Sequence, residues 1–281
     1  MSRSQSYSIH QAQQIPQQGG VWLIKFTLEA HSPSPFSIDS HFKLVGSEAN
    51  FSLFQQSVTQ QGLALQLFSD QPLSETLLNT SSTTNTLVCT HASSLREDAL
   101  SNDVNTLIIG SDLALANVFY LAKQRAQFKQ HTSHTLALLH CTQDFPFKVK
   151  PARFMVHDLP PEAIGACPLL EDWTISNRLA SDQGHPGCFD GPLEQLLANW
   201  LTQKATNEAL VPWQIIACMS PEMYQKCQAA CKPYPWVTLI GLTSSQLVNE
   251  SEMQEILGDK PLMENLANGL DDFKKGDYDL V

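Results

Sequence analysis

Short stretches in which apolar and polar residues alternate run along the chain from Val21 to about Cys89. Turn residues separate these stretches, and this period-two pattern with little helix predicts a small antiparallel β-barrel over residues 21–104. The preceding residues 1–20 are rich in Gln and Ser and show no periodicity, so we expect a flexible lead-in there. The expected strands cover residues 21–28, 42–46, 50–54, 63–68 and 86–90.

A different pattern begins at Asn105, where short strands are apolar throughout and alternate with segments of helical periodicity. Such strands are typical of a parallel sheet with helices on both faces, which we expect over residues 105–247. The expected strands cover residues 106–110, 135–141, 213–219 and 236–242, and the expected helices cover 111–128, 192–203 and 221–232. The predicted fold class is therefore an N-terminal antiparallel β-barrel followed by a parallel-sheet α/β domain.

The charge balance limits the classes of partner. The 281 residues include 17 basic and 28 acidic side chains, which gives a formal net charge of −11. Nucleic acids and anionic lipids are both recognised by basic surfaces, so we expect neither as a partner. The C-terminal residues 248–281 hold nine acidic side chains and three lysines. This acidic tail is either a solvated helical segment or a docking segment for a basic partner.

The apolar segments and the cysteines indicate a compartment. The longest apolar run, residues 107–122, is interrupted by Asp112 and Asn117 and is shorter than the about 20 residues that a membrane span needs. No segment of signal-peptide type precedes the first predicted strand. The seven cysteines form no CxxC pair, which suits a reducing compartment. We therefore expect a cytoplasmic protein with no membrane span and no metal site.

Five segments carry candidate chemistry, and their order along the chain is informative. They are residues 49–53 (Ala-Asn-Phe-Ser-Leu), 71–77 (Gln-Pro-Leu-Ser-Glu-Thr-Leu), 109–123 (beginning Ile-Gly-Ser-Asp), 181–187 (Ser-Asp-Gln-Gly-His-Pro-Gly) and 217–223 (Ala-Cys-Met-Ser-Pro-Glu-Met). In this order the chain resembles the ferredoxin–NADP reductase-like superfamily over residues 21–242. The likeness is greatest to the electron-transfer subunit of dihydroorotate dehydrogenase and to flavin reductases. It implies a flavin-binding barrel followed by an NAD(P)-binding domain of the ferredoxin-reductase type.

The resemblance implies a site for FAD or FMN on the barrel. Phe51 would flank the flavin, and Ser52 would form a hydrogen bond near it. Ser74 would open a helix whose backbone amides hold the pyrophosphate. The iron–sulfur cluster of the dihydroorotate dehydrogenase subunit is not expected, because no cysteine follows Cys231.

The resemblance also implies a site for NAD(P)H on the parallel sheet. Gly110 would let the dinucleotide approach the backbone closely. Asp182, with Gly184 in the same segment, would accept hydrogen bonds from the ribose, unless this segment is an ordinary surface turn. Cys218, the candidate catalytic residue, would lie beside the nicotinamide ring, or it is simply a buried strand thiol.

Several positions depart from the superfamily pattern. Ala49 and Gln71 stand where the superfamily has arginine and glycine, and Ser111 and Asp112 replace glycines. Asp112 either repels a phosphate or caps the following helix. In addition, no Lys or Arg occurs between Leu44 and Leu95, so a diphosphate would lack charge-assisted hydrogen bonds.

Two functions therefore stay open at the level of the sequence. The first is an oxidoreductase that passes electrons from NAD(P)H through a flavin to an acceptor, which could be a protein. The second is a cofactor-less protein of the same fold that acts as a binding or assembly module.

Overall fold

The computed structural model describes residues 3–28, 36–59, 62–79, 85–91, 104–127, 132, 134–207 and 211–242. The chain divides into two units at residues 243 and 244, and all described residues belong to the first. The expectations for the acidic tail at residues 248–281 therefore lie outside the described residues.

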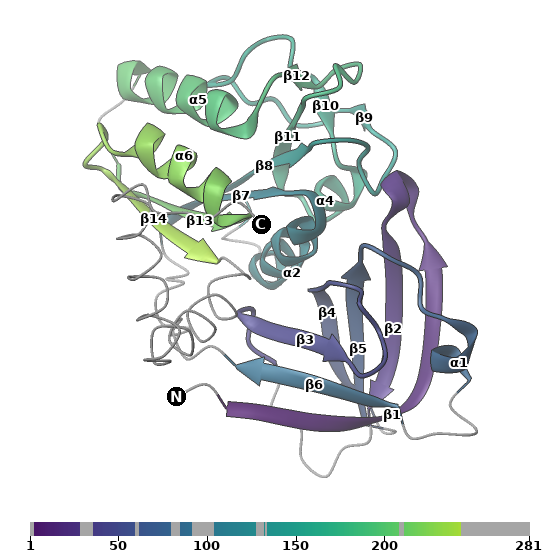
Figure 1. The fold of residues 1–281 in the computed structure, drawn as a ribbon. Coiled ribbons are helices and arrows are strands. Elements are labelled where there is room, and N and C mark those ends of the chain that lie inside the picture. Colours follow the sequence, from purple (N-terminus) through teal and green to yellow (C-terminus); the bar gives the residue numbers. More distant parts are fainter. Residues whose placement is uncertain are drawn as a thin grey trace, which may run out of the picture. The chain divides into compact units, whose positions relative to one another are not determined.

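The N-terminal part is a curled antiparallel sheet whose strand order is β3-β6-β1-β2-β5-β4 (Figure 1). The two edge strands, β3 and β4, contact each other, so the sheet curls into a barrel-like shape around one apolar core. The predicted antiparallel barrel is therefore confirmed. The strands are β1 (Arg3–Pro16), β2 (Trp22–Leu28), β3 (Ser40–Leu44), β4 (Phe51–Thr59), β5 (Gly62–Ser69) and β6 (Thr86–His91).

Strand β1 corrects the expectation of a flexible lead-in over residues 1–20. Its first half pairs with β6 and its second half pairs with β2. The register shifts between Ile9 and Gln11, and such a bulge bends a strand. The Gln- and Ser-rich segment is ordered because it pairs along both halves, which its composition does not reveal. The short helix η1 (Gln18–Gly20) forms the turn into β2.

The second part is a six-stranded parallel sheet in the order β12-β11-β8-β7-β13-β14, which confirms the predicted α/β domain. Two-residue strands β9 (Lys150–Pro151) and β10 (Gly165–Ala166) form a separate small ladder that the sequence did not predict. The strands of the large sheet are β7 (Asn105–Ser111), β8 (Thr135–Cys141), β11 (Ser176–Ser181), β12 (Phe189–Asp190), β13 (Trp213–Cys218) and β14 (Val237–Leu242).

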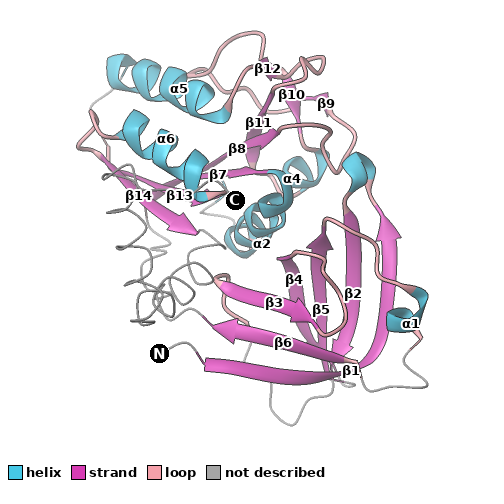
Figure 2. Ribbon diagram, viewed as in Figure 1, coloured by secondary structure: helices cyan, strands magenta, loops and turns pink. Residues whose placement is uncertain are grey.

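Helices cover both faces of the parallel sheet (Figure 2). Leucines of α5 share one buried cluster with Cys227 and Cys231 of α6, and α2 and α4 contribute to the cluster on the other face. The helices are α1 (Glu75–Leu78) on the barrel, then η3 (Asp112–Ala114), α2 (Leu115–Ala126), α4 (Pro168–Asp172), α5 (Leu193–Asn207) and α6 (Pro221–Cys231). Within the described part of the chain, no helix is both long and apolar enough to span a membrane.

Helix α2 packs directly against the barrel strand β4. Phe54 and Phe68 of the barrel stack with ring centroids 4.9 Å apart, and Phe119 of α2 meets both rings edge-on at 5.9 and 6.1 Å. Two polar contacts flank these rings: Gln56 Nε2 donates to the Tyr120 hydroxyl at 2.8 Å, and Lys123 Nζ donates to Gln55 Oε1 at 2.6 Å. The barrel and the sheet domain therefore contribute to one buried cluster where they meet, in addition to the barrel's own core.

Candidate functional site

The serine expected at the flavin is bonded within the protein. Ser52, on β4, donates a hydrogen bond through its hydroxyl to the side-chain oxygen of Asn117, on α2. The Asn117 amide in turn donates to the Ile38 carbonyl oxygen at 3.3 Å. Phe51 is half-buried and packs against the barrel core. The Ser52 hydroxyl thus links the barrel to the sheet domain.

An acidic side chain lies next to the start of β4. The backbone N–H and the side-chain amide of Asn50 donate to the Asp70 carboxylate at 2.8 and 2.6 Å. Ala49, which stands where the superfamily has arginine, is buried. This end of the strand therefore presents a carboxylate rather than the cation that would pair with a phosphate.

Ser74 occupies the N-cap position of α1, a helix of only four residues, and its side chain makes no capping hydrogen bond. Its hydroxyl lies 2.9 Å from that of Thr76, in an exposed position. The segment before α1 is fixed to the barrel through Leu73, whose N–H donates to Gln14 at 2.8 Å and whose carbonyl accepts from the same side chain. The structure thus places Ser74 on the barrel, apart from the sheet positions expected for NAD(P)H.

Gly110 lies near the carboxyl end of β7, opposite Cys218 in the register of β13. A Cβ atom at Gly110 would lie 2.3 Å from a methyl group of Val118 and 2.9 Å from the Cys218 carbonyl oxygen. The glycine therefore permits the close approach of α2 and β13 to β7. Neighbouring residues of the protein itself therefore fill the space that a side chain at position 110 would need.

Asp112 does not cap the following helix, which corrects one of the two expectations for this residue. Ser111 holds the N-cap position of η3, and the Asp112 backbone adopts the left-handed φ of 51°. The Asp112 carboxylate accepts hydrogen bonds from the N–H and the hydroxyl of Thr142 at 2.9 and 3.0 Å. Asp112 therefore joins the loops that follow two adjacent strands, β7 and β8.

Asp182 and Cys218 both lie at the carboxyl edge of the sheet but differ in exposure. Asp182 follows β11, is partly exposed, and has Oδ2 3.3 Å from Nε2 of the fully buried His140 on β8. Gly184 has a φ of +63°, and a Cβ atom there would lie 3.8 Å from Asp190 Oδ1, an ordinary contact. Cys218 is fully buried, and burial raises the pKa of its thiol well above the ordinary value.

Among the described residues, no group of three His, Cys, Asp or Glu side chains could hold a metal ion.

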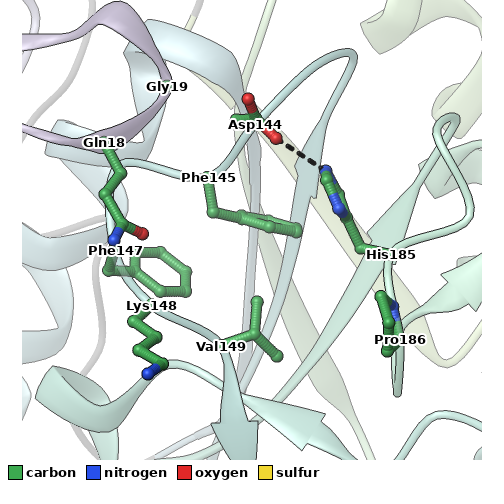
Figure 3. A pocket seen from close by; sticks show the side chains of 9 residues that line it. All are labelled: Gln18, Gly19, Asp144, Phe145, Phe147, Lys148, Val149, His185 and Pro186. Carbon is green, nitrogen blue, oxygen red and sulfur yellow. Dashed lines mark ion pairs between the residues drawn. The ribbon is translucent and has the colours of Figure 1, made fainter.

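A pocket of about 460 Å³ lies at the same edge of the sheet (Figure 3). Its walls come from three segments: Gln18 and Gly19 of the turn between β1 and β2, the loop at 144–149 after β8, and His185 with Pro186 after β11. The sequence pointed to the segment 181–187, which contains His185 and Pro186, but not to the loop at 144–149 or the turn at 18–19. The available signal was positional, because loops that follow adjacent parallel strands meet at one edge.

Several close contacts hold the pocket walls together. His185 Nε2 lies 3.2 Å from the Asp144 carboxylate and 3.0 Å from the Gln143 carbonyl oxygen. Gly19 has a φ of +67°, and a Cβ there would lie 2.3 Å from the Asp144 carbonyl oxygen. The turn of the barrel therefore fits tightly against the loop of the sheet domain only because residue 19 is glycine.

Comparison with known proteins shows similarity of fold. No family model matches the sequence, and no curated protein matches it either. Three solved structures are similar. The Amycolatopsis cytochrome P450 reductase GcoB is 13% identical with a TM-score of 0.53, and the alignment covers 87% of this chain and 71% of that protein. A ferredoxin reductase in carbazole 1,9a-dioxygenase is 12% identical with a TM-score of 0.52, covering 86% and 70%.

The third is the siderophore-interacting protein from an Acinetobacter species, 7% identical with a TM-score of 0.52, covering 91% of this chain and 98% of that protein. The chain therefore has the ferredoxin–NADP reductase-like fold. The resemblance drawn from its motifs is confirmed at that level.

Proposed function

We propose that this protein is a binding module that uses the ferredoxin reductase fold without the flavin chemistry of that fold. The hydrogen bond from Ser52 to Asn117 carries the proposal, because the hydroxyl that a flavin would engage is committed to α2. The Asp70 carboxylate at the start of β4 also supports the proposal, because it stands where a flavin phosphate would need a cation. Since no Lys or Arg occurs between Leu44 and Leu95, the residues present do not fit a diphosphate bound through charge-assisted hydrogen bonds.

An oxidoreductase is the second candidate, in which the protein passes electrons from NAD(P)H through FAD or FMN to an acceptor protein. It is favoured by the five segments that occur in the order of the superfamily and by structural neighbours that are named as reductases. In that case the flavin supplies the electron chemistry, and the protein supplies binding and orientation. The contact between Ser52 and Asn117 would have to open to admit it.

The acidic tail, residues 248–281, is the part of the chain that we propose for contact with a basic partner. Its net charge of −6, from nine acidic side chains and three lysines, gives the electrostatic complementarity for such a contact.

One set of measurements separates the two candidates. The full chain is purified, its visible absorbance is recorded, and FAD, FMN, NADH and NADPH are titrated into it by calorimetry. We expect a colourless protein that binds neither flavin at tens of micromolar. A bound flavin that NADH bleaches would instead establish the oxidoreductase.

Variants test whether the flavin site has lost its cation and its free hydroxyl. The double variant Ala49→Arg with Asn117→Ala restores a positive charge and releases the Ser52 hydroxyl, so we expect it to gain measurable flavin binding. Val58→Arg is the matched control, because Val58 is exposed and lies at the opposite end of the same strand. A gain of binding in the control as well would show non-specific attraction of the flavin phosphate.

A further inference from the structure

We infer that the protein's own side chains occupy the place at the parallel sheet where a dinucleotide such as NAD(P)H would bind. In open α/β sheets, ligands bind outside the carboxyl ends of the strands, at the point where the strand order reverses. Here that point lies between β7 and β13, because β8, β11 and β12 follow on one side of β7, and β13 and β14 lie on the other. The inference goes beyond the proposed function, which concerns the flavin.

The carboxyl ends of β7 and β13 are closely packed around Gly110. A Cβ atom at Gly110 would lie 2.9 Å from the carbonyl oxygen of Cys218, its partner in the register, and 3.4 Å from the Cys218 Cβ. On the side of α2 it would lie 2.3 Å from a methyl group of Val118. Non-bonded carbon atoms keep about 3.5–4.0 Å apart, so a position that cannot hold a methyl group cannot hold a ligand atom either.

Met219 fills the next position along the chain. It follows Cys218, the last residue of β13, and is only 2% exposed. Its side chain belongs to the buried cluster that α5 and α6 form with the sheet. A glycine at this position would leave the backbone open to a ligand, whereas the flexible methionine side chain fills the gap.

The start of α6, directly after Met219, is already capped. The N-terminal N–H groups of a helix that follows a strand are a common binding place for a phosphate. Here Ser220 is the N-cap residue, and its hydroxyl accepts a hydrogen bond from the Met223 N–H at 3.4 Å. One of the donors that a phosphate would use is therefore bonded within the protein.

The Asp112 carboxylate takes the place of an anion at the loop after β7. Its Oδ1 accepts hydrogen bonds from the N–H and the hydroxyl of Thr142, in the loop after β8, at 2.9 and 3.0 Å. The Asp112 backbone has a φ of 51°, which residues other than glycine adopt only at an energetic cost. The two hydrogen bonds hold the carboxylate there, and they use donors that a phosphate oxygen would need.

The other charges at this edge do not suit a diphosphate. Asp182, after β11, has a partly exposed carboxylate. Arg178, on β11, is buried, and its guanidinium donates to the carbonyl oxygens of Asn177 and Phe154, both at 2.7 Å. A diphosphate would meet the carboxylates of Asp112 and Asp182 without help from this guanidinium. The residues present therefore do not fit NAD(P)H.

The test titrates NADH and NADPH separately into the full-length protein by calorimetry. We expect no saturable binding of either at millimolar concentration. The double variant Asp112→Gly with Met219→Ala removes the carboxylate and the methionine side chain, and glycine suits the backbone conformation at position 112. We expect this variant to bind at least one dinucleotide roughly tenfold or more above the wild-type limit, because the like charge and the blocking side chain are gone.

The matched control is Asp144→Gly with Met223→Ala. It also removes one carboxylate and shortens one methionine, but Asp144 is an exposed residue of the loop after β8 and Met223 lies within α6. We expect the control to bind neither dinucleotide. Thermal unfolding establishes that each variant is folded.

A second measurement covers the case in which the double variant does not fold. Asp112→Gly alone is titrated with inorganic pyrophosphate, which needs only the place of the carboxylate. We expect it to bind roughly tenfold more tightly than the wild type or Asp144→Gly does. Equal binding of pyrophosphate to the three proteins would overturn the inference.

Saturable binding of NADH or NADPH by the wild-type protein would also overturn it. So would a folded double variant that binds neither, or an equal gain of binding in the control. Flavin binding in the separate titration would contradict the proposed function and leave this inference standing, whereas binding of NADH without a flavin would do the reverse.

Discussion

Replacing Gly110 with alanine should destabilise the protein, because the added methyl group has no room. Its carbon would lie 2.3 Å from a methyl of Val118, on α2, and 2.9 Å from the Cys218 carbonyl oxygen, on β13. Val118 is fully buried. The carbonyl oxygen belongs to a strand that pairs with β7 at this position, so it can shift only if the strands separate.

The size of the effect follows from two opposing contributions. Overpacking of a core typically costs about 1–3 kcal/mol. Removing a glycine also restricts the unfolded chain, which stabilises the folded state by about 0.4–1 kcal/mol where the backbone conformation allows alanine. Gly110 is not in the left-handed region, so this compensation applies. Contacts under 3.0 Å on two sides place the overpacking cost in the upper part of its range, and we expect a net loss of about 1–2 kcal/mol.

The assay is urea unfolding followed by circular dichroism, with the free energy of unfolding taken by linear extrapolation. Val118→Ala provides the matched second change. Alone it should destabilise by roughly 1–2 kcal/mol, because it removes two buried methyl groups. The double variant should be more stable than the sum of the two effects, by about 1 kcal/mol or more, since the new methyl group fills space that Val118 vacates.

Unchanged stability of Gly110→Ala would refute the packing argument. So would additivity of the two substitutions, because residues that compete for the same space must couple. In either case the glycine would have to serve something other than the approach of α2 and β13 to β7.

Two further predictions concern the interface and the buried thiols. Ser52→Ala should lower the free energy of unfolding by about 1 kcal/mol in the same assay, because the Asn117 oxygen loses its donor; a loss that persists undiminished in Asn117→Ala would contradict this. Burial raises the pKa of the Cys89 and Cys188 thiols from 9.0 to about 11. Between these values the unfolded chain has released protons that the folded chain keeps, so the unfolding temperature should fall as the pH rises from about 9 to about 11. Cys188→Ala should reduce the slope, and an identical slope would refute the assignment.

Hydrophobic periodicity was sufficient for most of the fold. The alternation in 63–68 predicts β5 to within one residue at each end, because Leu63, Leu65 and Leu67 are buried in the barrel core while the residues between them are half-buried. The segment 135–141, which is apolar apart from Thr135 and His140, predicts β8 for the opposite reason: every residue in it is buried.

Strand β1 was missed because its order comes from pairing rather than from pattern. The segment Arg3–Pro16 is rich in Gln and Ser, and its side chains give no clear period. It is held by backbone hydrogen bonding to β6 along its first half and to β2 along its second. Its partners lie 6 to 19 residues away in β2 and 78 to 88 residues away in β6, and the composition of the segment does not reveal them.

The candidate site, too, could be predicted from the sequence only in part. The sequence predicted that Gly110 and Cys218 belong to one region, and the register of β7 and β13 pairs them. It did not predict that Asn117 bonds to Ser52, because these residues are 65 positions apart and meet only where α2 packs on the barrel.

By itself, the sequence determined an antiparallel barrel followed by a parallel α/β domain, because burial on one or both faces of an element leaves a period in the chain. It also determined the absence of positive charge from Leu44 to Leu95. The tertiary structure alone decided that the Ser52 hydroxyl is bonded to α2 and that Phe147, Lys148 and His185 line one pocket. These contacts join loops and strands that are distant in sequence. They depend on how two separately patterned sheets pack together, which no local period encodes.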